Sequence, residues 1–493
     1  MYRIAASRLN AIKGRAGIIQ SSSSSRSIFS LFGDGTSSQP TLDTPLTGVT
    51  IPPPLPDYVE PSKTKITTLP NGVRIASEAS ANPAASIGLY VDCGSNNETP
   101  ESCGVSHLLE RMAFKSTRNR SHFSVVREVE AIGGHVAASA SREQMGYTHD
   151  ALKAYVPQMV EQLVDTVRNP VFLDWEVTEQ LKKVKDEIAE MDNNPQGLLM
   201  EAIHSAGYVG ALANPLLAPM SAISRLNSKI LEEFVAENYT APRMVLAASG
   251  VEHEELLSVA ESLLSDLPGG TTSARPKSEY VGGDSRIAAA SPVAHVALAF
   301  EVPGGWLNEK DAMAATVLQL LMGGGGSFSA GGPGKGMHSR LYLRVLNQYH
   351  QMQSFSAFSS IYTDTGLFGI HASTGSGFAS KAVDIATREL LEVATAGKVT
   401  QTELDRAKIA TKSAVLMNLE SRMVVSEDIG RQVLTYGERK PVDHFLKAVD
   451  AVTLKDISSI ATKIISSPLT MASWGDVSYV PSYDSVSSKF SSQ

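Results

Sequence analysis

Three polar side chains lie close together within one apolar stretch of the sequence. The stretch reads His107-Leu-Leu-Glu110-Arg111-Met-Ala-Phe-Lys115. Residues three and four positions apart share one face of a helix, so these three side chains are expected to point the same way. A zinc motif of the form His-x-x-Glu-His has this spacing: its two imidazoles bind the metal, and its glutamate activates a water molecule. In this sequence Arg111 takes the place of the second imidazole.

The segment resembles the pitrilysin-type inverzincin peptidases. Its Met-Ala-Phe-Lys continuation is close to the mitochondrial processing peptidases and the cytochrome bc1 core proteins within that family. The resemblance implies a third metal ligand, a glutamate about 76 residues after the second histidine, and the count from Arg111 reaches Glu187. It also implies an accessory glutamate seven residues earlier, where this sequence has Gln180. Arg111 and Gln180 therefore depart from the zinc pattern, while His107, Glu110 and Glu187 keep it.

Arginine is a poor substitute for a metal ligand, because it stays protonated and has no lone pair to offer. A unit charge about 4 Å from a divalent ion costs about 8 kcal/mol at an effective dielectric constant near 20. That cost offsets much of the roughly 10–16 kcal/mol typical of structural zinc binding. We therefore expect no catalytic residue, no metal and no other cofactor in this chain, and expect Arg111 to pair with Glu110 or Glu187. The alternative is that His107 and Glu110 are ordinary helix residues.

A second motif is a glycine-rich segment, in which eight of the fourteen residues from 323 to 336 are glycine. A phosphate-binding loop does not fit, because Ser329 stands where its first glycine belongs and Gly336 replaces the required serine or threonine. A passive linker is the other alternative, but long loops inside a domain are more often functional.

This segment resembles the glycine-rich segment of the α subunits of mitochondrial processing peptidase. The resemblance implies that it contacts the presequences of imported precursors, since backbone with few side chains lets an extended peptide approach closely. The implied presequence-binding residues are Gly323, Gly324, Gly325, Gly326, Ser327, Phe328, Ser329, Gly331, Gly332, Gly334, Lys335 and Gly336.

The amino terminus differs in composition from the rest of the chain. Residues 1–33 contain five arginine and lysine residues, and no acidic residue precedes Asp34. Together with the serine run 21–25, this composition predicts a mitochondrial transit peptide, the alternative being a disordered basic tail. Residues 34–63 are rich in proline and are expected to form an extended leader.

The remainder of the sequence consists of two similar halves. The strand-like stretches Ala85–Ser95 and Ala294–Gly304 lie 209 positions apart, and each precedes a helical pattern. A second pair of similar stretches lies near the ends of the two halves, Met244–Gly250 in the first and Leu469–Gly475 in the second. These offsets predict an α+β fold of two duplicated domains, each a largely antiparallel sheet covered by helices. The expected boundaries are 64–267 for the first domain, 268–288 for a linker and 289–485 for the second domain.

Composition excludes several other classes of protein. With 493 residues, 42% hydrophobic and 19% charged, the chain has enough apolar material for real cores. The net charge of −8 argues against nucleic-acid binding. Two cysteines exclude a disulfide framework. No apolar stretch reaches the roughly 20 residues of a membrane span.

The resemblance implies a non-catalytic, substrate-recognition subunit of a zinc metalloendopeptidase heterodimer, the mitochondrial processing peptidase. Its expected partners are a zinc-bearing β subunit and the presequences of precursors. Its expected location is the mitochondrial matrix or the matrix face of the inner membrane, where the resemblance also implies contact with cytochrome bc1 complex subunits. The alternatives are a purely structural core subunit of the cytochrome bc1 complex and an active zinc peptidase with unorthodox ligands.

Overall fold

The computed structural model describes residues 63–270, 277–326 and 336–491. The predicted transit peptide lies outside the described residues, as does all but the last residue of the predicted proline-rich leader. The centre of the glycine-rich segment, residues 327–335, lies outside them too. Within the described ranges, every helix is too short or too polar to cross a membrane.

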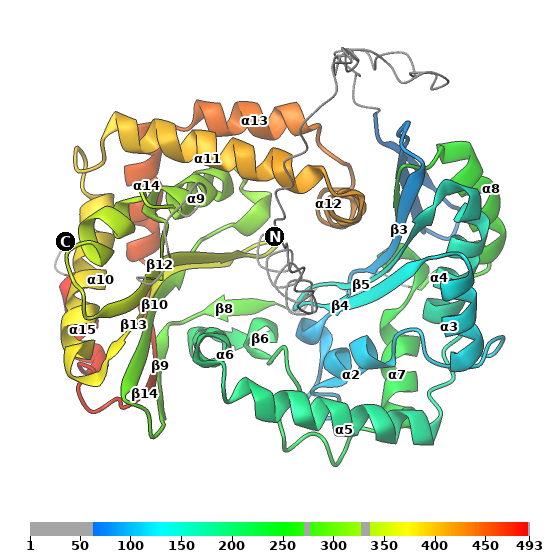
Figure 1. Ribbon diagram of the computed structural model, residues 1–493, viewed down its shortest axis with the longest axis horizontal. Helices are drawn as coiled ribbons and strands as arrows, with labels where there is room; N and C mark the ends of the chain where they lie inside the picture. Colours follow the sequence, from blue (N-terminus) through cyan, green and yellow to red (C-terminus); the bar gives the residue numbers. More distant parts are fainter. Residues whose placement is uncertain (1–62, 271–276, 327–335, 492–493) are drawn as a thin grey trace, which may run out of the picture. The chain divides into compact units, whose positions relative to one another are not determined.

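The first half of the chain builds a six-stranded sheet in the order β1-β2-β7-β3-β5-β4 (Figure 1). The strands are β1 (Lys65–Thr68), β2 (Arg74–Glu78), β3 (Ala84–Val91), β4 (His135–Ala140), β5 (Met145–Leu152) and β7 (Met244–Ser249). Only the β2–β7 pair among them is parallel. The sheet is therefore largely antiparallel, as the sequence predicts.

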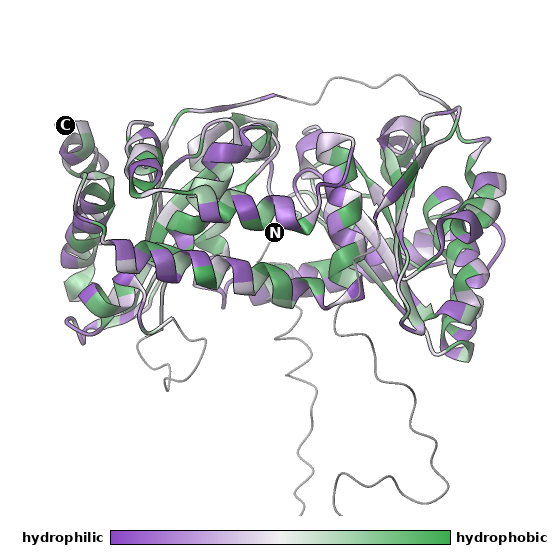
Figure 2. Cartoon of the chain, turned by 90° about the horizontal axis from the view of Figure 1, so that it is seen from above, coloured by the Kyte–Doolittle hydropathy of each residue, from purple (hydrophilic) through white to green (hydrophobic). Residues whose placement is uncertain are grey.

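Amphipathic helices cover one face of this sheet. Those that contact its strands are α2 (Val105–Met112), α3 (His122–Ala131), α4 (Val156–Arg168) and α8 (His253–Leu264). Helices α5 (Asp174–Met191) and α7 (Ser228–Asn238) pack on α2. In α4, for example, Met159, Val160, Leu163 and Val167 recur at helical spacing and are all buried. Figure 2 shows the resulting division of the helices into hydrophilic and hydrophobic sides.

The second half builds another six-stranded sheet, in the order β11-β12-β13-β10-β14-β9. Its strands are β9 (Gly283–Ala288), β10 (Val293–Glu301), β11 (Gly324–Gly326), β12 (Met352–Ile361), β13 (Gly366–Gly375) and β14 (Thr470–Gly475). Its helices include α9 (Glu309–Met322), α10 (Ala379–Ala394), α11 (Gln401–Leu419), α13 (Val442–Ala451), α14 (Leu454–Ile465) and α15 (Tyr483–Ser491).

The two sheets have the same topology, which confirms the duplication. Five neighbouring strands of the first sheet have the order β2-β7-β3-β5-β4. The corresponding strands of the second sheet have the order β9-β14-β10-β13-β12. The parallel pair falls at the same place in both, between β2 and β7 and between β9 and β14. Strands β1 and β11 lie at opposite edges and have no counterpart in the other half. The glycine-rich β11 is thus an addition to the repeated unit.

Each half contributes one helix to the other half. Helix α6 (Pro195–Gly207) packs against β9, β10 and β14 of the second sheet. Helix α12 (Arg422–Tyr436) packs against β2, β3 and β7 of the first sheet. The buried contacts of α12 include Val425, Ile429 and Val433 against Tyr90 and Val245. Because of this exchange, the described residues from Lys63 onward form one compact unit.

The prediction of a linker over residues 268–288 was wrong for its second part. Strands β8 (Ser278–Tyr280) and β9 lie within it, and β8 pairs with β6 (Tyr208–Gly210). The residues of β9 alternate between half-buried and exposed positions, as at the edge of a sheet. Because none of them is fully buried, the sequence of β9 has only a weak apolar pattern. Its parallel partner β14 is distant in the sequence, and the second repeat begins at β9 rather than after it.

Candidate functional site

The packing of α2 against α5 brings His107, Arg111 and Glu187 together. Nε2 of His107 lies 2.9 Å from Oε2 of Glu187. Nε of Arg111 donates to the same oxygen at 3.0 Å. Two side chains of α2, one helical turn apart, therefore meet one carboxylate of α5, which is the convergence that the motif and its spacing predict.

A backbone contact selects the tautomer of the His107 ring. The N–H of Ala218 donates to Nδ1 of His107 at 3.3 Å, so Nδ1 is the acceptor nitrogen. Nε2 then carries the hydrogen and donates to Glu187. His107 is also buried, with 2% of its surface exposed. Both ring nitrogens are therefore engaged within the protein, and Nε2 contacts the same carboxylate oxygen that Arg111 binds.

Glu110 holds the position of the water-activating glutamate in the zinc motif. Its Oε2 accepts a hydrogen bond from the backbone N–H of Ala140, at the end of β4, at 2.9 Å. Its Oε1 lies 3.6 Å from Nη2 of Arg111. Arg111 thus pairs with both glutamates that the sequence offers it, and the carboxylate of Glu110 is tied to the edge of the first sheet.

The remaining predicted position, Gln180, lies on α5 and is buried, with 3% of its surface exposed. Its side chain is a neutral amide, so it adds no negative charge to this region. Throughout the described ranges, no group of three or more His, Cys, Asp or Glu side chains is arranged to hold a metal ion. The residues present therefore fit a zinc ion poorly.

Glu98 positions the start of α2, and sequence reasoning missed it. Its two carboxylate oxygens accept the backbone N–H groups of Gly104, at 2.7 Å, and of Ser106, at 2.8 Å. These are donors that the first turn of a helix leaves unpaired. Burial raises the pKa of Glu98 to about 7, and the two N–H groups oppose this rise. The only sequence signal was an acidic residue six positions before the glycine that begins the helix.

The glycine-rich segment is described at its two ends, Gly323–Gly326 and Gly336. Strand β11 pairs with β12, with Gly324 opposite Ser356. A Cβ atom on Gly324 would lie 2.0 Å from the carbonyl oxygen of Phe355, so only glycine fits there. Nothing lies within 4 Å of the Cβ position of Gly325, so no steric clash requires glycine at that position.

Ser339 joins the two described ends of this segment. Its Oγ accepts the backbone N–H of Gly324 at 2.9 Å, and its own N–H donates to the carbonyl oxygen of Gly336 at 2.8 Å. The other predicted presequence-binding residues lie outside the described part of the chain: Ser327, Phe328, Ser329, Gly331, Gly332, Gly334 and Lys335.

Comparison with known proteins identifies the family. Residues 74–220 match the model of insulinase (peptidase family M16), and residues 225–411 match the model of the peptidase M16 inactive domain. The solved structure of complex III2 from Candida albicans contains a chain with a TM-score of 0.74 to this one. That likeness covers 86% of this chain and 99% of the other at 21% identity, and it shows a shared fold.

The curated relatives are similar over nearly their whole length. The mitochondrial-processing peptidase subunit alpha of Solanum tuberosum is 67% identical over 100% of both chains. A probable mitochondrial-processing peptidase subunit alpha-2 of Arabidopsis thaliana is 65% identical over 99% of this chain and 100% of the relative. The human mitochondrial-processing peptidase subunit alpha is 34% identical over 92% and 90%. This chain therefore belongs to peptidase family M16, in the group that contains the α subunits of the mitochondrial processing peptidase.

Proposed function

We propose that this chain is the non-catalytic, substrate-recognition subunit of a mitochondrial processing peptidase. It binds the presequences of imported precursors, and a zinc-bearing β subunit cleaves them. The observation that carries the proposal is the hydrogen bond between Arg111 and Glu187, at 3.0 Å. A protonated guanidinium cannot ligate a metal, and it binds the carboxylate that would otherwise do so.

The partner of the chain follows from the same group of relatives. Their names describe one subunit, alpha, of a mitochondrial enzyme. A β subunit in a heterodimer would supply the metal-activated water that attacks the scissile peptide bond. In this proposal the heterodimer acts in the mitochondrion, in the matrix or at the matrix face of the inner membrane.

The glycine-rich segment is the proposed presequence-binding part of the chain. Its described beginning is an edge strand made only of glycine, Gly324–Gly326, where a peptide meets backbone without side chains. Such a surface accepts many sequences, which suits a subunit that meets precursors with different presequences.

Two other functions have less support. The likeness to a complex III chain, at 21% identity, supports the fold alone, so a place in the cytochrome bc1 complex stays a prediction. An active zinc peptidase conflicts with Arg111, whose guanidinium stands in the place of a ligand and binds Glu187.

Zinc content and precursor cleavage test the proposal together. Both are measured for the chain purified without residues 1–62, alone and after mixing with a β-type partner. We expect no zinc and no cleavage from the chain alone, and both from the mixture. Stoichiometric zinc and cleavage by the lone chain would overturn the proposal.

A second experiment tests the role of the glycine-rich segment. Residues 327–335 are replaced by a serine–asparagine stretch of equal length, which keeps β11 and Ser339. In the heterodimer the apparent KM for a precursor should rise about tenfold with little change in kcat, because binding rather than chemistry is weakened. An unchanged KM would show that presequences bind elsewhere.

A further inference from the structure

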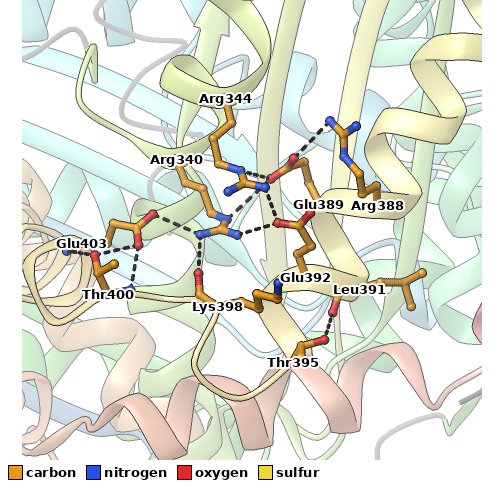
Figure 3. Close-up of polar contacts among 10 residues, drawn as sticks. All are labelled: Arg340, Arg344, Arg388, Glu389, Leu391, Glu392, Thr395, Lys398, Thr400 and Glu403. Carbon is orange, nitrogen blue, oxygen red and sulfur yellow. Dashed lines mark hydrogen bonds and ion pairs between the residues drawn. The ribbon is translucent and has the colours of Figure 1, made fainter.

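Two arginines follow the glycine-rich segment closely, and carboxylates from two other elements hold them (Figure 3). Arg340 is 1% exposed, and its Nη2 donates to Glu392 at 3.2 Å. Its Nη1 donates to Glu403 at 3.1 Å and to the carbonyl oxygen of Lys398 at 3.1 Å. Its Nε lies 3.5 Å from Glu389, whose side chain is completely buried. A single guanidinium thus meets three carboxylates.

Arg344 reinforces the same set of contacts. Its Nε donates to Oε2 of Glu389 at 2.9 Å, and its Nη2 donates to Glu392. Arg388 adds a third positive charge, 3.5 Å from Oε1 of Glu389. We call these six residues, Arg340, Arg344, Arg388, Glu389, Glu392 and Glu403, the Arg340 cluster. Its three positive and three negative charges balance.

The cluster joins three elements of the second half. Glu389 and Glu392 lie on α10, and Glu403 lies in the first turn of α11, where it also accepts the backbone N–H of Thr400 at 2.8 Å. Arg344 lies in a π-helix, Tyr342–Leu346, a rare element that often marks functional sites. On the other side of this stretch, Leu341 and Val345 are fully buried in the core. The stretch is therefore held from both sides.

The ion pairs of the cluster position the backbone more than they stabilise the fold. A buried ion pair often adds no more stability than apolar side chains of similar volume would, because both charges lose their hydration. What several directional hydrogen bonds supply is a defined position for the backbone that carries them. The cluster thus fixes where the chain lies after Gly336.

That position is transmitted to the glycine-rich segment through one residue. Ser339 directly precedes Arg340, and its Oγ accepts the N–H of Gly324 in β11 at 2.9 Å. It also contacts Gly336 through its backbone, at 2.8 Å. Because Arg340 is immobilised, Ser339 holds both described ends of the segment in a fixed relation.

We propose that Arg340 and Arg344 are positioning residues for presequence binding, which act through Ser339 on the ends of the glycine-rich segment. Arg340 does not touch the presequence itself, since it is buried against its carboxylates, and Arg344 directs its guanidinium to Glu389 and Glu392. This inference rests on the proposed function, because it assumes that the segment binds presequences.

The test uses the heterodimer with a zinc-bearing β subunit and a fluorescent precursor peptide. Arg340→Lys keeps the charge but loses the fork of hydrogen bonds. The apparent KM should rise about tenfold while kcat changes less than about twofold. Arg344→Lys should change KM in the same direction.

Arg120→Lys is the matched control. Arg120 also meets three carboxylates, Glu128 at 2.9 Å, Glu161 at 2.6 Å and Asp165 at 3.0 Å, but it lies in the first half. Arg120→Lys should lower Tm, by less than Arg340→Lys because Arg120 is 17% exposed and Arg340 is 1% exposed, and it should leave KM unchanged. An equal rise of KM in Arg120→Lys would mean a general loss of stability and would overturn the inference.

Ser339→Ala covers the case in which Arg340→Lys fails to fold. It removes the hydrogen bond to Gly324 and leaves the buried charges in place, and it should raise KM about threefold. An unchanged KM in Ser339→Ala overturns the inference. If replacing residues 327–335 raises KM and Ser339→Ala does not, only the positioning role fails. If neither changes KM, presequence binding at this segment fails as well.

Discussion

Arg111 and His107 approach the same carboxylate oxygen, Oε2 of Glu187, at 3.0 Å and 2.9 Å. Both side chains come from one face of α2, and the glutamate comes from α5. A fixed positive charge therefore lies where the motif would otherwise gather metal ligands. His107, Glu110 and Glu187 keep the pattern of the zinc motif, while Arg111, in the place of a ligand, forms ion pairs with both glutamates.

Replacing Arg111 by histidine should restore zinc binding. His107, the new imidazole and Glu187 would then supply the three ligands of the His-x-x-Glu-His pattern, which this family places on two helices. We expect about one zinc per chain in Arg111→His after dialysis and none in the unmodified chain. Elemental analysis and competition with a chelating dye measure it.

Arg111→Gln is the control for this experiment. It removes the positive charge without adding a strong ligand, so it should bind no zinc. Arg111 and Glu187 are 39% and 33% exposed, so the loss of their pair should change the free energy of unfolding by less than about 1 kcal/mol. Stoichiometric zinc in Arg111→Gln would mean that charge alone, and not the missing ligand, prevents binding.

Local patterns in the sequence predicted much of this site and fold. The spacing of His107, Glu110 and Arg111 placed them on one helix face, and the family resemblance, rather than a local pattern, pointed to Glu187. The repeated strands identified the duplication, because buried strands have strong apolar patterns.

Contacts between distant residues were not predictable in this way. The Arg340 cluster depends on carboxylates that lie 45 to 63 positions from Arg340 and Arg344 and are brought to them by the tertiary packing. The exchange of α6 and α12 between the sheets has no local signal, because each helix is amphipathic whichever sheet it covers. Strand β9 was not predicted from the sequence for a related reason, because it is a strand through its pairing with the distant β14.

Gly430→Ala should destabilise the contact between α12 and the first sheet. A Cβ atom at this position would lie 2.2 Å from the ring of Tyr90, so either the helix or the ring must move. The free energy of unfolding should fall by about 1–3 kcal/mol, although alanine favours a helix by up to about 1 kcal/mol. Urea denaturation measures it. Gly377→Ala is the control, because nothing lies within 4 Å of its Cβ position, and a similar loss there would contradict the argument.

His149 should make the protein less stable in weak acid. The residue is fully buried, and burial lowers its pKa to about 4 from the usual 6.5. The unfolded chain therefore binds a proton before the folded chain does, so stability is lost as the pH falls from about 6.5 to about 4. The loss amounts to about 3 kcal/mol at most.

The measurement is urea denaturation at pH 7.5, 6 and 5. The acid-induced loss should be smaller in His149→Gln than in the unmodified chain, because glutamine does not titrate. His350 is exposed, so His350→Gln should keep the full pH dependence. Equal slopes for His149→Gln and the unmodified chain would contradict the prediction.

Glu98 should contribute a pH dependence of the opposite sign. Burial raises its pKa to about 7 from 4.5, so the folded state binds a proton that the unfolded state releases. The stabilisation from this residue is complete below about pH 4.5 and is lost as the pH rises through about 7, by about 3 kcal/mol at most. His149 titrates in the opposite sense over an overlapping pH range, so each contribution is obtained from the difference between a variant and the unmodified chain. Comparing Glu98→Gln with the unmodified chain at pH 5, 6.5 and 8 separates them. The unmodified chain should exceed the variant in stability most at pH 5, and the difference should shrink as the pH rises.

Glu101 is exposed and lies three positions along the chain, so Glu101→Gln should show no such change. A constant difference between Glu98→Gln and the unmodified chain would mean that the carboxylate keeps its charge when α2 is formed, held by Gly104 and Ser106 alone.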